Sequence, residues 1–163
     1  MKINPRDVKE ITLLSIEEAE QVPQELRVLK VDGVPHWWWL RSPAFFWEAA
    51  ASVSPDGSIR EGGNYVDCDF DYVRPALRVS IPESSGLKDL DKVEVFGHTW
   101  TVITNDLILC DDSLGQMVFR KDAEESYANY YEESDVKRWL EGWLQEQLTI
   151  AEQRELPDRV VVM

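Results

Sequence analysis

The sequence is poor in cysteine and histidine, with two residues of each kind among 163. Cys68 and Cys110 are too few for the disulfide framework of a small secreted domain, and their spacing is not that of a zinc site. His36 and His98 lack the short spacing at which two histidines hold a metal. We therefore predict free thiols, no bound metal and no cofactor.

Basic residues are also scarce. The chain has 17 Lys and Arg against 31 Asp and Glu, which gives a formal net charge of -14 at pH 7. Direct binding to nucleic acid or to an anionic membrane needs a basic patch that releases counterions, and this composition argues against one. The charge instead suits a basic partner, including a protein surface that normally holds nucleic acid.

Long hydrophobic runs and common catalytic motifs are missing. No run approaches the roughly 18 apolar residues of a membrane span, and residues 1–5 lack the apolar stretch of a signal peptide. No glycine-rich phosphate loop occurs, and Ser42 lacks the flanking glycines of a hydrolase nucleophile. We predict a cytoplasmic, non-enzymatic protein that has no catalytic residue and does not contact a membrane.

Large apolar side chains are abundant. Hydrophobic residues make up 44% of the chain and seven of them are Trp, enough to form the core of one folded domain. In segment 36–40, Trp37 and Trp39 alternate with Trp38 and Leu40, which predicts a central strand covered on both faces. Similar patterns predict further strands at 11–14, 49–53, 58–60, 65–70, 73–79, 92–96, 98–103, 106–110 and 159–162.

Capping signals predict two helices. Ser15 and Glu18 have the spacing of a capping box, and Ser134 caps a longer helix that Pro157 stops. Turns are expected at 54–57, 61–64 and Gly97. The predicted fold class is α+β, a mixed, mainly antiparallel sheet with one or two packed helices. The core-facing stripe of the longer helix comprises Val136, Trp139, Leu140, Trp143, Leu144 and Leu148.

Several motifs are shared with a known family. The first half contains Leu13-Leu14-Ser15-Ile16-Glu17-Glu18, then Trp38-Trp39-Leu40-Arg41-Ser42-Pro43, Ala51-Ser52-Val53-Ser54-Pro55-Asp56-Gly57 and Val73-Arg74-Pro75-Ala76-Leu77. The second half contains Gly97-His98-Thr99-Trp100-Thr101-Val102-Ile103 and Ser134-Asp135-Val136-Lys137-Arg138-Trp139-Leu140. With these motifs the chain resembles an uncharacterised bacterial and phage domain family. Trp38, Trp39, Arg41, Arg74 and Trp139 are the expected structural residues of the motifs.

The resemblance implies a C-type-lectin-like fold, similar to formylglycine-generating-enzyme-like domains and used mostly for binding. In the family the second half usually comes first, so the chain resembles a circular permutation. We expect a single domain over 1–163, with halves 1–81 and 92–163 joined by a linker at 82–91. Permutation predicts that Met1 and Met163 lie on one side of the molecule. A monomer and a dimer that swaps half-domains are both compatible with this order.

The formylglycine-generating relatives also suggest a role for the cysteines as a nucleophile or a copper site. Cys68 and Cys110 fall in predicted strands with apolar neighbours, which favours inert core thiols instead.

Aromatic residues in expected loops are the main candidates for binding. Phe45, Phe46 and Trp47 follow a proline, and we predict that they join Tyr127, Tyr130 and Tyr131 in a surface for a protein or a small ligand. Segment 37–39 could also form a ligand platform, but core packing is the favoured interpretation.

Charged residues suggest further hypotheses. Asp67, Asp69 and Asp71 are expected on one face of a strand, as a solvated acidic face, a calcium site or an imitation of a phosphate backbone. The last of these motivates an alternative function, an acidic phage-type inhibitor that occupies the basic nucleic-acid groove of a host defence protein. Arg41 and Arg74 could clamp an anion together, although bonding to backbone carbonyls or a core carboxylate is favoured.

Overall fold

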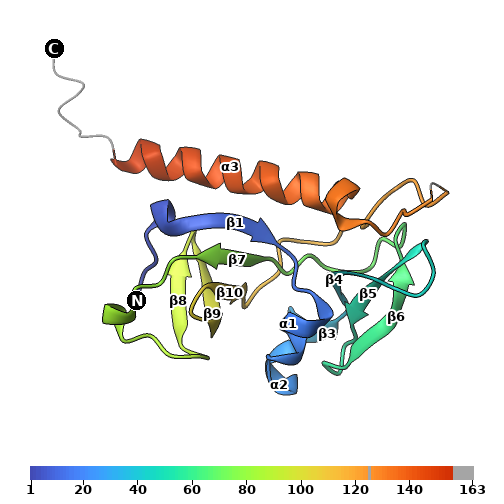
Figure 1. Ribbon diagram of the computed structural model, residues 1–163, viewed down its shortest axis with the longest axis horizontal. Coiled ribbons are helices and arrows are strands. Elements are labelled where there is room, and N and C mark those ends of the chain that lie inside the picture. Colours follow the sequence, from blue (N-terminus) through green and yellow to red (C-terminus); the bar gives the residue numbers. More distant parts are fainter. Residues whose placement is uncertain (125, 156–163) are drawn as a thin grey trace, which may run out of the picture.

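The computed structural model describes residues 1–124 and 126–155 (Figure 1). Its largest element is a five-stranded antiparallel sheet in the order β1-β7-β10-β9-β8. A long helix, α3, lies along β1 on one face of this sheet. The elements of this part are η1 (Pro5–Asp7), β1 (Val8–Thr12), β7 (Ala76–Val79), η2 (Glu83–Ser85), β8 (Lys92–Val95), β9 (His98–Thr104), β10 (Leu107–Cys110), η3 (Tyr131–Glu133) and α3 (Asp135–Glu155).

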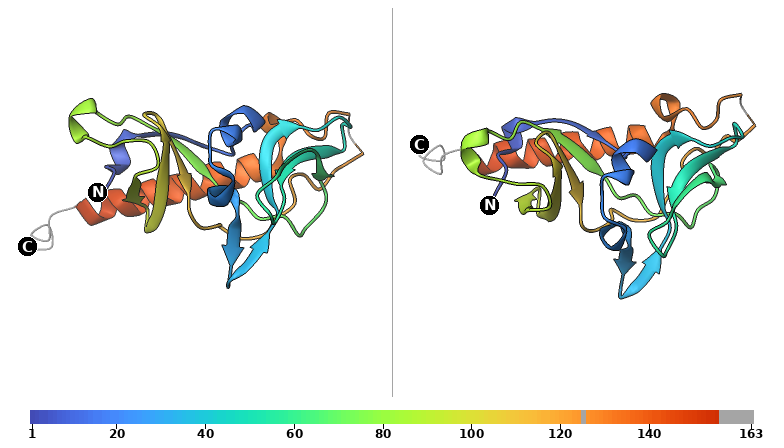
Figure 2. Two further views of the ribbon diagram at one scale, coloured as in Figure 1. Left: turned by 90° about the horizontal axis from the view of Figure 1, so that it is seen from below. Right: turned by 60° about the horizontal axis from the view of Figure 1, so that its bottom comes forward.

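The segment between β1 and β7 forms a second part of the molecule, beside the five-stranded sheet, with two smaller antiparallel sheets. One is a hairpin that projects from the body of the molecule, as Figure 2 shows. The other has three strands in the order β4-β5-β6. The elements here are α1 (Ile16–Glu20), α2 (Gln24–Arg27), β2 (Leu29–Val31), β3 (Val34–His36), β4 (Trp38–Pro43), β5 (Ala49–Val53) and β6 (Ile59–Tyr65). The predicted α+β class with mainly antiparallel pairing is confirmed.

Two adjacent tryptophans pack in the two core clusters of the molecule. Trp38 and Trp39 are both completely buried and, as neighbours on a strand, point to opposite faces. Trp39 packs in a cluster with Trp100, Phe119 and the buried face of α3, whereas Trp38 packs in a second cluster with Leu109. Each indole donates to a backbone carbonyl, Trp38 to Arg27 and Trp39 to Met117, both at 2.9 Å. Core packing is therefore confirmed for Trp38 and Trp39, whereas Trp37 is only partly buried.

The expected central position of this strand is wrong. β4 lies at the edge of its sheet and pairs only with β5 there. Its other edge is covered by irregular backbone, because Arg41 N donates to the Leu14 carbonyl at 2.8 Å and Trp39 N to the Tyr72 carbonyl at 3.1 Å. The strand is thus covered on both sides without being central in a sheet.

The capping box at Ser15 is present and links several elements. Ser15 Oγ accepts from the Glu18 amide at 3.1 Å, and the Glu18 carboxylate accepts from the Ser15 amide at 2.9 Å. The same carboxylate pairs with Arg41 on β4 and with Arg78 on β7. Burial would raise the Glu18 pKa, but these hydrogen bonds outweigh it and hold the pKa at about 2. Glu18 therefore links α1 to β4 and to β7.

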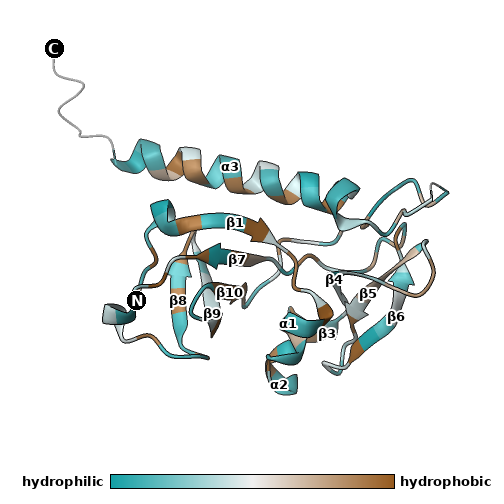
Figure 3. Cartoon of the chain, in the orientation of Figure 1, coloured by the Kyte–Doolittle hydropathy of each residue, from teal (hydrophilic) through white to brown (hydrophobic). Residues whose placement is uncertain are grey.

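The helix α3 differs from prediction in one residue. Ser134 caps it as expected, since its hydroxyl accepts from the Lys137 amide at 3.1 Å. Val136 and Leu140 are buried, but Trp139, predicted to face the core, is exposed. Figure 3 shows that most of α3 is hydrophilic with hydrophobic stretches between, as expected of a helix that covers a sheet with one face.

Two predictions for segment 61–71 are wrong. Residues 61–64 form no turn but belong to β6, where a register shift between Ala50 and Ser52 of β5 marks an irregularity in the pairing. The predicted strand at 65–70 is absent, because β6 ends at Tyr65 and turns follow. The Gly62-Gly63 pair accommodates an irregular strand as well as it would a turn.

Two further predicted turns are present, and some predictions concern residues that the structure does not describe. The predicted turns at 54–57 and Gly97 both join paired strands, and Gly97 has a φ of 77°. The predicted strand at 159–162, Pro157 and Met163 lie outside the described residues. No helix in the described ranges is both long and apolar enough to cross a membrane.

Candidate functional site

Two segments far apart in the sequence present exposed aromatic side chains at the same end of the molecule. One is the loop between β4 and β5, and the other precedes η3 (Figures 1 and 2). We call the five side chains the aromatic patch. Its members are Phe45 (81% exposed), Phe46 (68%), Trp47 (42%), Tyr127 (59%) and Tyr130 (51%).

A buried amide holds the two segments together. The side chain of Asn129 is almost fully buried, and its Nδ2 donates to the carbonyl oxygens of Phe46 and Ala49, each at 3.0 Å. The loop is also closed on itself, because Ala44 N donates to the Ala49 carbonyl and Ala49 N donates to the Phe46 carbonyl. The aromatic side chains therefore stand on a fixed backbone rather than on a free loop.

The tyrosine segment has its own fixed geometry. Tyr127 and Tyr130 place their ring centroids 5.1 Å apart, and Tyr130 N donates to the Tyr127 carbonyl at 2.9 Å. Tyr127 has a φ of 64°, in the left-handed region that costs a bulky residue about 1–3 kcal/mol. Such a conformation persists only where surrounding contacts maintain it, here the neighbouring Asn129 bonds.

A shallow hollow adjoins the patch. It has a volume of about 360 Å³ and lies between Tyr130, Pro43 and Arg41. Beside the aromatic loop, Tyr65 is also exposed and stands opposite Ala49 in the β5–β6 pairing. The arrangement is an exposed set of aromatic side chains with a recess next to it.

Exposed carboxylates lie close in sequence to the patch residues and to Tyr65. They follow Tyr65, precede Tyr127 and follow Tyr130. Because such groups favour cations and repel anions, the rim of the site is suited to a basic partner surface. The exposed members are Asp67, Asp69, Asp122, Glu124, Glu132 and Glu133.

Tyr131, predicted to belong to the binding surface, is instead in the core. It is buried, and its ring centroid lies 6.3 Å from that of Phe119. Burial raises its pKa to about 12, with the nearby cations Lys137 and Arg41 opposing the shift. The neighbouring Tyr130 is exposed, so of the two adjacent rings one packs in the core and the other belongs to the aromatic patch.

The predicted acidic face is also wrong. Asp67 and Asp69 are exposed, but Asp71 is completely buried and accepts hydrogen bonds from Ser52 at 3.0 Å and Asn64 at 2.8 Å. Burial raises the Asp71 pKa to about 6 although both hydrogen bonds oppose this. Within the described ranges, no cluster of three potential ligands is arranged to hold a metal ion.

The two motif arginines are separated rather than combined in an anion clamp. Arg41 donates to the Leu13 carbonyl and pairs with Glu18. Arg74 lies next to Trp38, with its guanidinium carbon 5.0 Å from the centre of the Trp38 ring. It donates hydrogen bonds to the Cys110 and Leu26 carbonyls. Bonding to backbone carbonyls, the favoured interpretation, is confirmed for both.

The two cysteines are not paired with each other. Cys110 is buried, which raises its pKa to about 12, and Cys68 is partly buried, which raises its pKa as well. Raised pKa values leave both thiols protonated at neutral pH and therefore poorly nucleophilic.

Sequence reasoning located the five aromatic residues but missed Asn129 and Tyr65. A buried Asn in an acidic, aromatic loop has no periodic pattern that would distinguish it from an exposed one. Comparison of the chain with protein-family models, with curated proteins and with solved structures finds no match.

Proposed function

We propose that this chain is a non-enzymatic binding module that recognises another protein through the aromatic patch. The observation that carries the proposal is the Asn129 side chain, which joins two distant segments and so brings their exposed aromatic residues to the same end of the molecule. Large exposed aromatic clusters are uncommon on proteins that act alone, and aromatic anchors dominate the energy of many interfaces.

The partner fits a definite description. Its contact surface has an apolar centre that covers Phe45, Phe46 and Tyr130, and a rim of Lys and Arg that faces the carboxylates around the patch. The free thiols of Cys68 and Cys110 suit a cytoplasmic location for the complex.

A pull-down from nuclease-treated bacterial lysate tests the proposal. Three baits are compared: the unmodified chain, the double variant Phe46→Ser/Tyr130→Ser, and the control Val34→Ser, which removes an exposed apolar residue from the β2–β3 hairpin. We expect mass spectrometry to find a protein retained by the unmodified chain and by Val34→Ser but lost with the double variant. Equal retention by all three baits would contradict the proposal.

The charge supports a second candidate, the acidic phage-type inhibitor that occupies a basic nucleic-acid groove. The net charge of -14 and the exposed Asp67 and Asp69 favour it. Binding would then weaken steeply with salt, and reversing both charges with Asp67→Lys/Asp69→Lys would weaken it further. A complex that survives 0.5 M salt but is lost with the aromatic double variant would reject this candidate and support the first.

We also propose that the fold is C-type-lectin-like in circularly permuted order. Mainly antiparallel sheets with one long packed helix support this, and so does the Arg6–Glu155 ion pair of 2.7 Å, which brings the end of α3 to the N-terminal segment. A chain opened within 82–91, with residue 163 joined to Met1 through a short linker, should keep the original far-UV circular dichroism spectrum. An unfolded product would contradict the proposal.

A further inference from the structure

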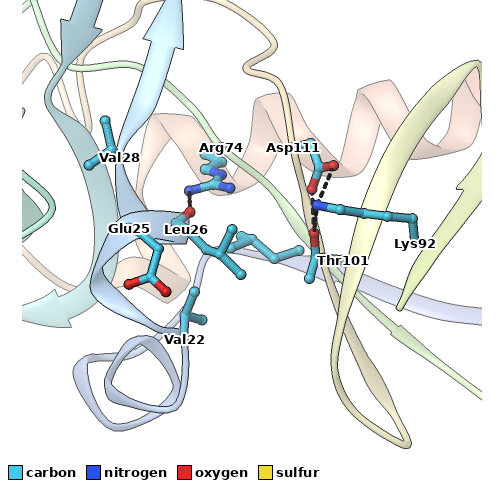
Figure 4. A pocket seen from close by; sticks show the side chains of 9 residues that line it. Val22, Glu25, Leu26, Val28, Arg74, Lys92, Thr101 and Asp111 are labelled. Carbon is cyan, nitrogen blue, oxygen red and sulfur yellow. Dashed lines mark hydrogen bonds and ion pairs between the residues drawn. The ribbon is translucent and has the colours of Figure 1, made fainter. Parts of the chain in front are cut away.

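A pocket separate from the aromatic patch lies between α2 and the strands β9 and β10 (Figure 4). Its volume is about 190 Å³. Val22, Leu26 and Leu109 supply apolar walls, Thr101, Lys92 and Asp111 supply a polar one, and the exposed Glu25 lies at the rim. Arg74 also lines it, with its guanidinium facing the space between Leu26 and Thr101.

The guanidinium of Arg74 is nearly fully buried and only partly satisfied. Its Nε donates to the Cys110 carbonyl at 2.7 Å and its Nη1 to the Leu26 carbonyl at 3.0 Å. Its Nη2 donates to no residue in the described part of the chain, and no described carboxylate forms an ion pair with it. Burial lowers the Arg74 pKa to about 10, so the group remains charged at neutral pH.

The nearest acidic group on the polar wall is already engaged. Lys92 Nζ donates to Asp111 at 2.9 Å and to Thr101 Oγ1 at 2.7 Å, and Thr101 donates to Asp111 in turn. Asp111 is therefore neutralised by Lys92. Arg74 thus has no carboxylate in direct contact, and the nearby charges of Asp111 and Asp112, the two carbonyls and the Trp38 ring offset only part of the cost of burying its charge.

We propose that this pocket binds a small carboxylate with a short apolar body. The carboxylate would accept from Arg74 Nη2, and the apolar body would lie against Val22, Leu26 and Leu109. The volume equals that of about six water molecules, which limits the bound part to roughly six to eight non-hydrogen atoms. A free branched-chain acid and the C-terminal residue of a peptide share this chemistry.

Titration followed by ¹H–¹⁵N NMR on the full chain tests the proposal. The probe is 3-methylbutanoate, its uncharged control is 3-methylbutanamide, and sodium chloride keeps the ionic strength constant. We expect saturable shifts at Leu26, Leu109 and Asp111 with the acid, at a Kd of about 1 mM, and none with the amide. N-acetyl-leucine distinguishes the sources: tighter binding than 3-methylbutanoate assigns the pocket to a peptide C-terminus, and weaker binding assigns it to a free acid.

Variants separate loss of the site from loss of the fold. Arg74→Gln should abolish binding, but it alters a buried group and could unfold the chain. Leu26→Trp fills the pocket from a half-exposed position and should weaken binding at least about tenfold, whereas Val34→Trp, outside the pocket, should leave it unchanged. Equal shifts with acid and amide, no saturable shift, or unaltered binding to a folded Leu26→Trp variant would overturn the proposal.

Discussion

At the scale of single residues, Asn129 has the largest effect on the proposed site. Its side-chain amide donates hydrogen bonds to the carbonyls of Phe46 and Ala49 and so joins the tyrosine segment to the aromatic loop. Both carbonyls also accept a backbone amide within the loop, so the Asn129 bonds are the ones that reach the tyrosine segment. The shape of the aromatic patch therefore depends on one buried polar group.

Asn129→Ala should lower the free energy of unfolding by about 1–3 kcal/mol, because it removes two side-chain hydrogen bonds that join the tyrosine segment to the aromatic loop. Chemical denaturation measures this loss. Hydrogen exchange at the Ala44 and Ala49 amides should also become faster as the loop loosens. The control Asn105→Ala changes an exposed Asn and should have little effect; equal effects of both variants would contradict the role of Asn129.

Glu18 determines part of the acid stability. Its pKa is about 2 in the folded chain against an ordinary value of 4.5, so its stabilising contribution is complete above about pH 4.5 and is lost as the pH falls toward 2. Glu18→Gln should lower the free energy of unfolding at pH 7 by about 2–3 kcal/mol and flatten its pH dependence between these values.

Denaturation curves across that pH range measure the effect of Glu18. Glu17→Gln is the matched control, since Glu17 is exposed in the same helical turn. If Glu18→Gln kept the pH dependence of the unmodified chain, the ion pairs with Arg41 and Arg78 would not have the stabilising role assigned to them.

The sequence predicted correctly that the aromatic loop is exposed, but it did not predict which of two adjacent tyrosines is buried. Phe45 and Phe46 follow Pro43 outside any periodic pattern, and the structure exposes both. Nothing local distinguishes Tyr130 from Tyr131, because their burial depends on which one meets Phe119 from a distant segment. The burial of Asp71 also depends on residues elsewhere in the fold, since Ser52 of β5 and Asn64 of β6 donate hydrogen bonds to it.

At the scale of elements, prediction was accurate where local chemistry decides. The capping box at Ser15, the cap at Ser134 and the hairpin turn at Gly97 each involve residues a few positions apart. Trp139 shows the limit of periodicity: it lies beside the buried stripe of α3, but the sheet covers only a narrow strip around Val136 and Leu140.

The strand β6 illustrates why a Gly-Gly pair is ambiguous. Gly63 has a φ of 55°, and a Cβ added there would stand 1.7 Å from the Ala50 carbonyl oxygen, whereas one at Gly62 would meet nothing within 4 Å. The backbones of β5 and β6 thus approach too closely for any side chain at Gly63. Turns and irregular strands both need such a residue.

Gly63→Ala should lower the free energy of unfolding by at least about 2 kcal/mol, because it combines strain with a clash. Gly62→Ala is the matched control and should change it by less than about 0.5 kcal/mol. Thermal or chemical denaturation of the two variants measures the difference. Similar stabilities would contradict the close β5–β6 approach.

At the scale of the whole molecule, the fold depends on pairings between distant segments. β7 pairs with β1 on one side and with β10 on the other, so both halves of the sequence contribute to one sheet. Composition and alternation predicted the α+β class, but they do not specify sheet order, because each strand pattern fits several partners. The meeting of the two aromatic segments follows from that unpredicted topology.

Photo-crosslinking with benzoyl-phenylalanine tests most directly whether the aromatic patch is the contact surface. The probe replaces Phe45 in one chain and Val34, another exposed residue, on the β2–β3 hairpin, in a second. After irradiation in bacterial lysate, we expect position 45 to yield a discrete crosslinked protein that is lost in the Asn129→Ala background, and position 34 to yield none. The same crosslinked protein from both positions, or one from position 34 alone, would contradict a partner bound at the aromatic patch.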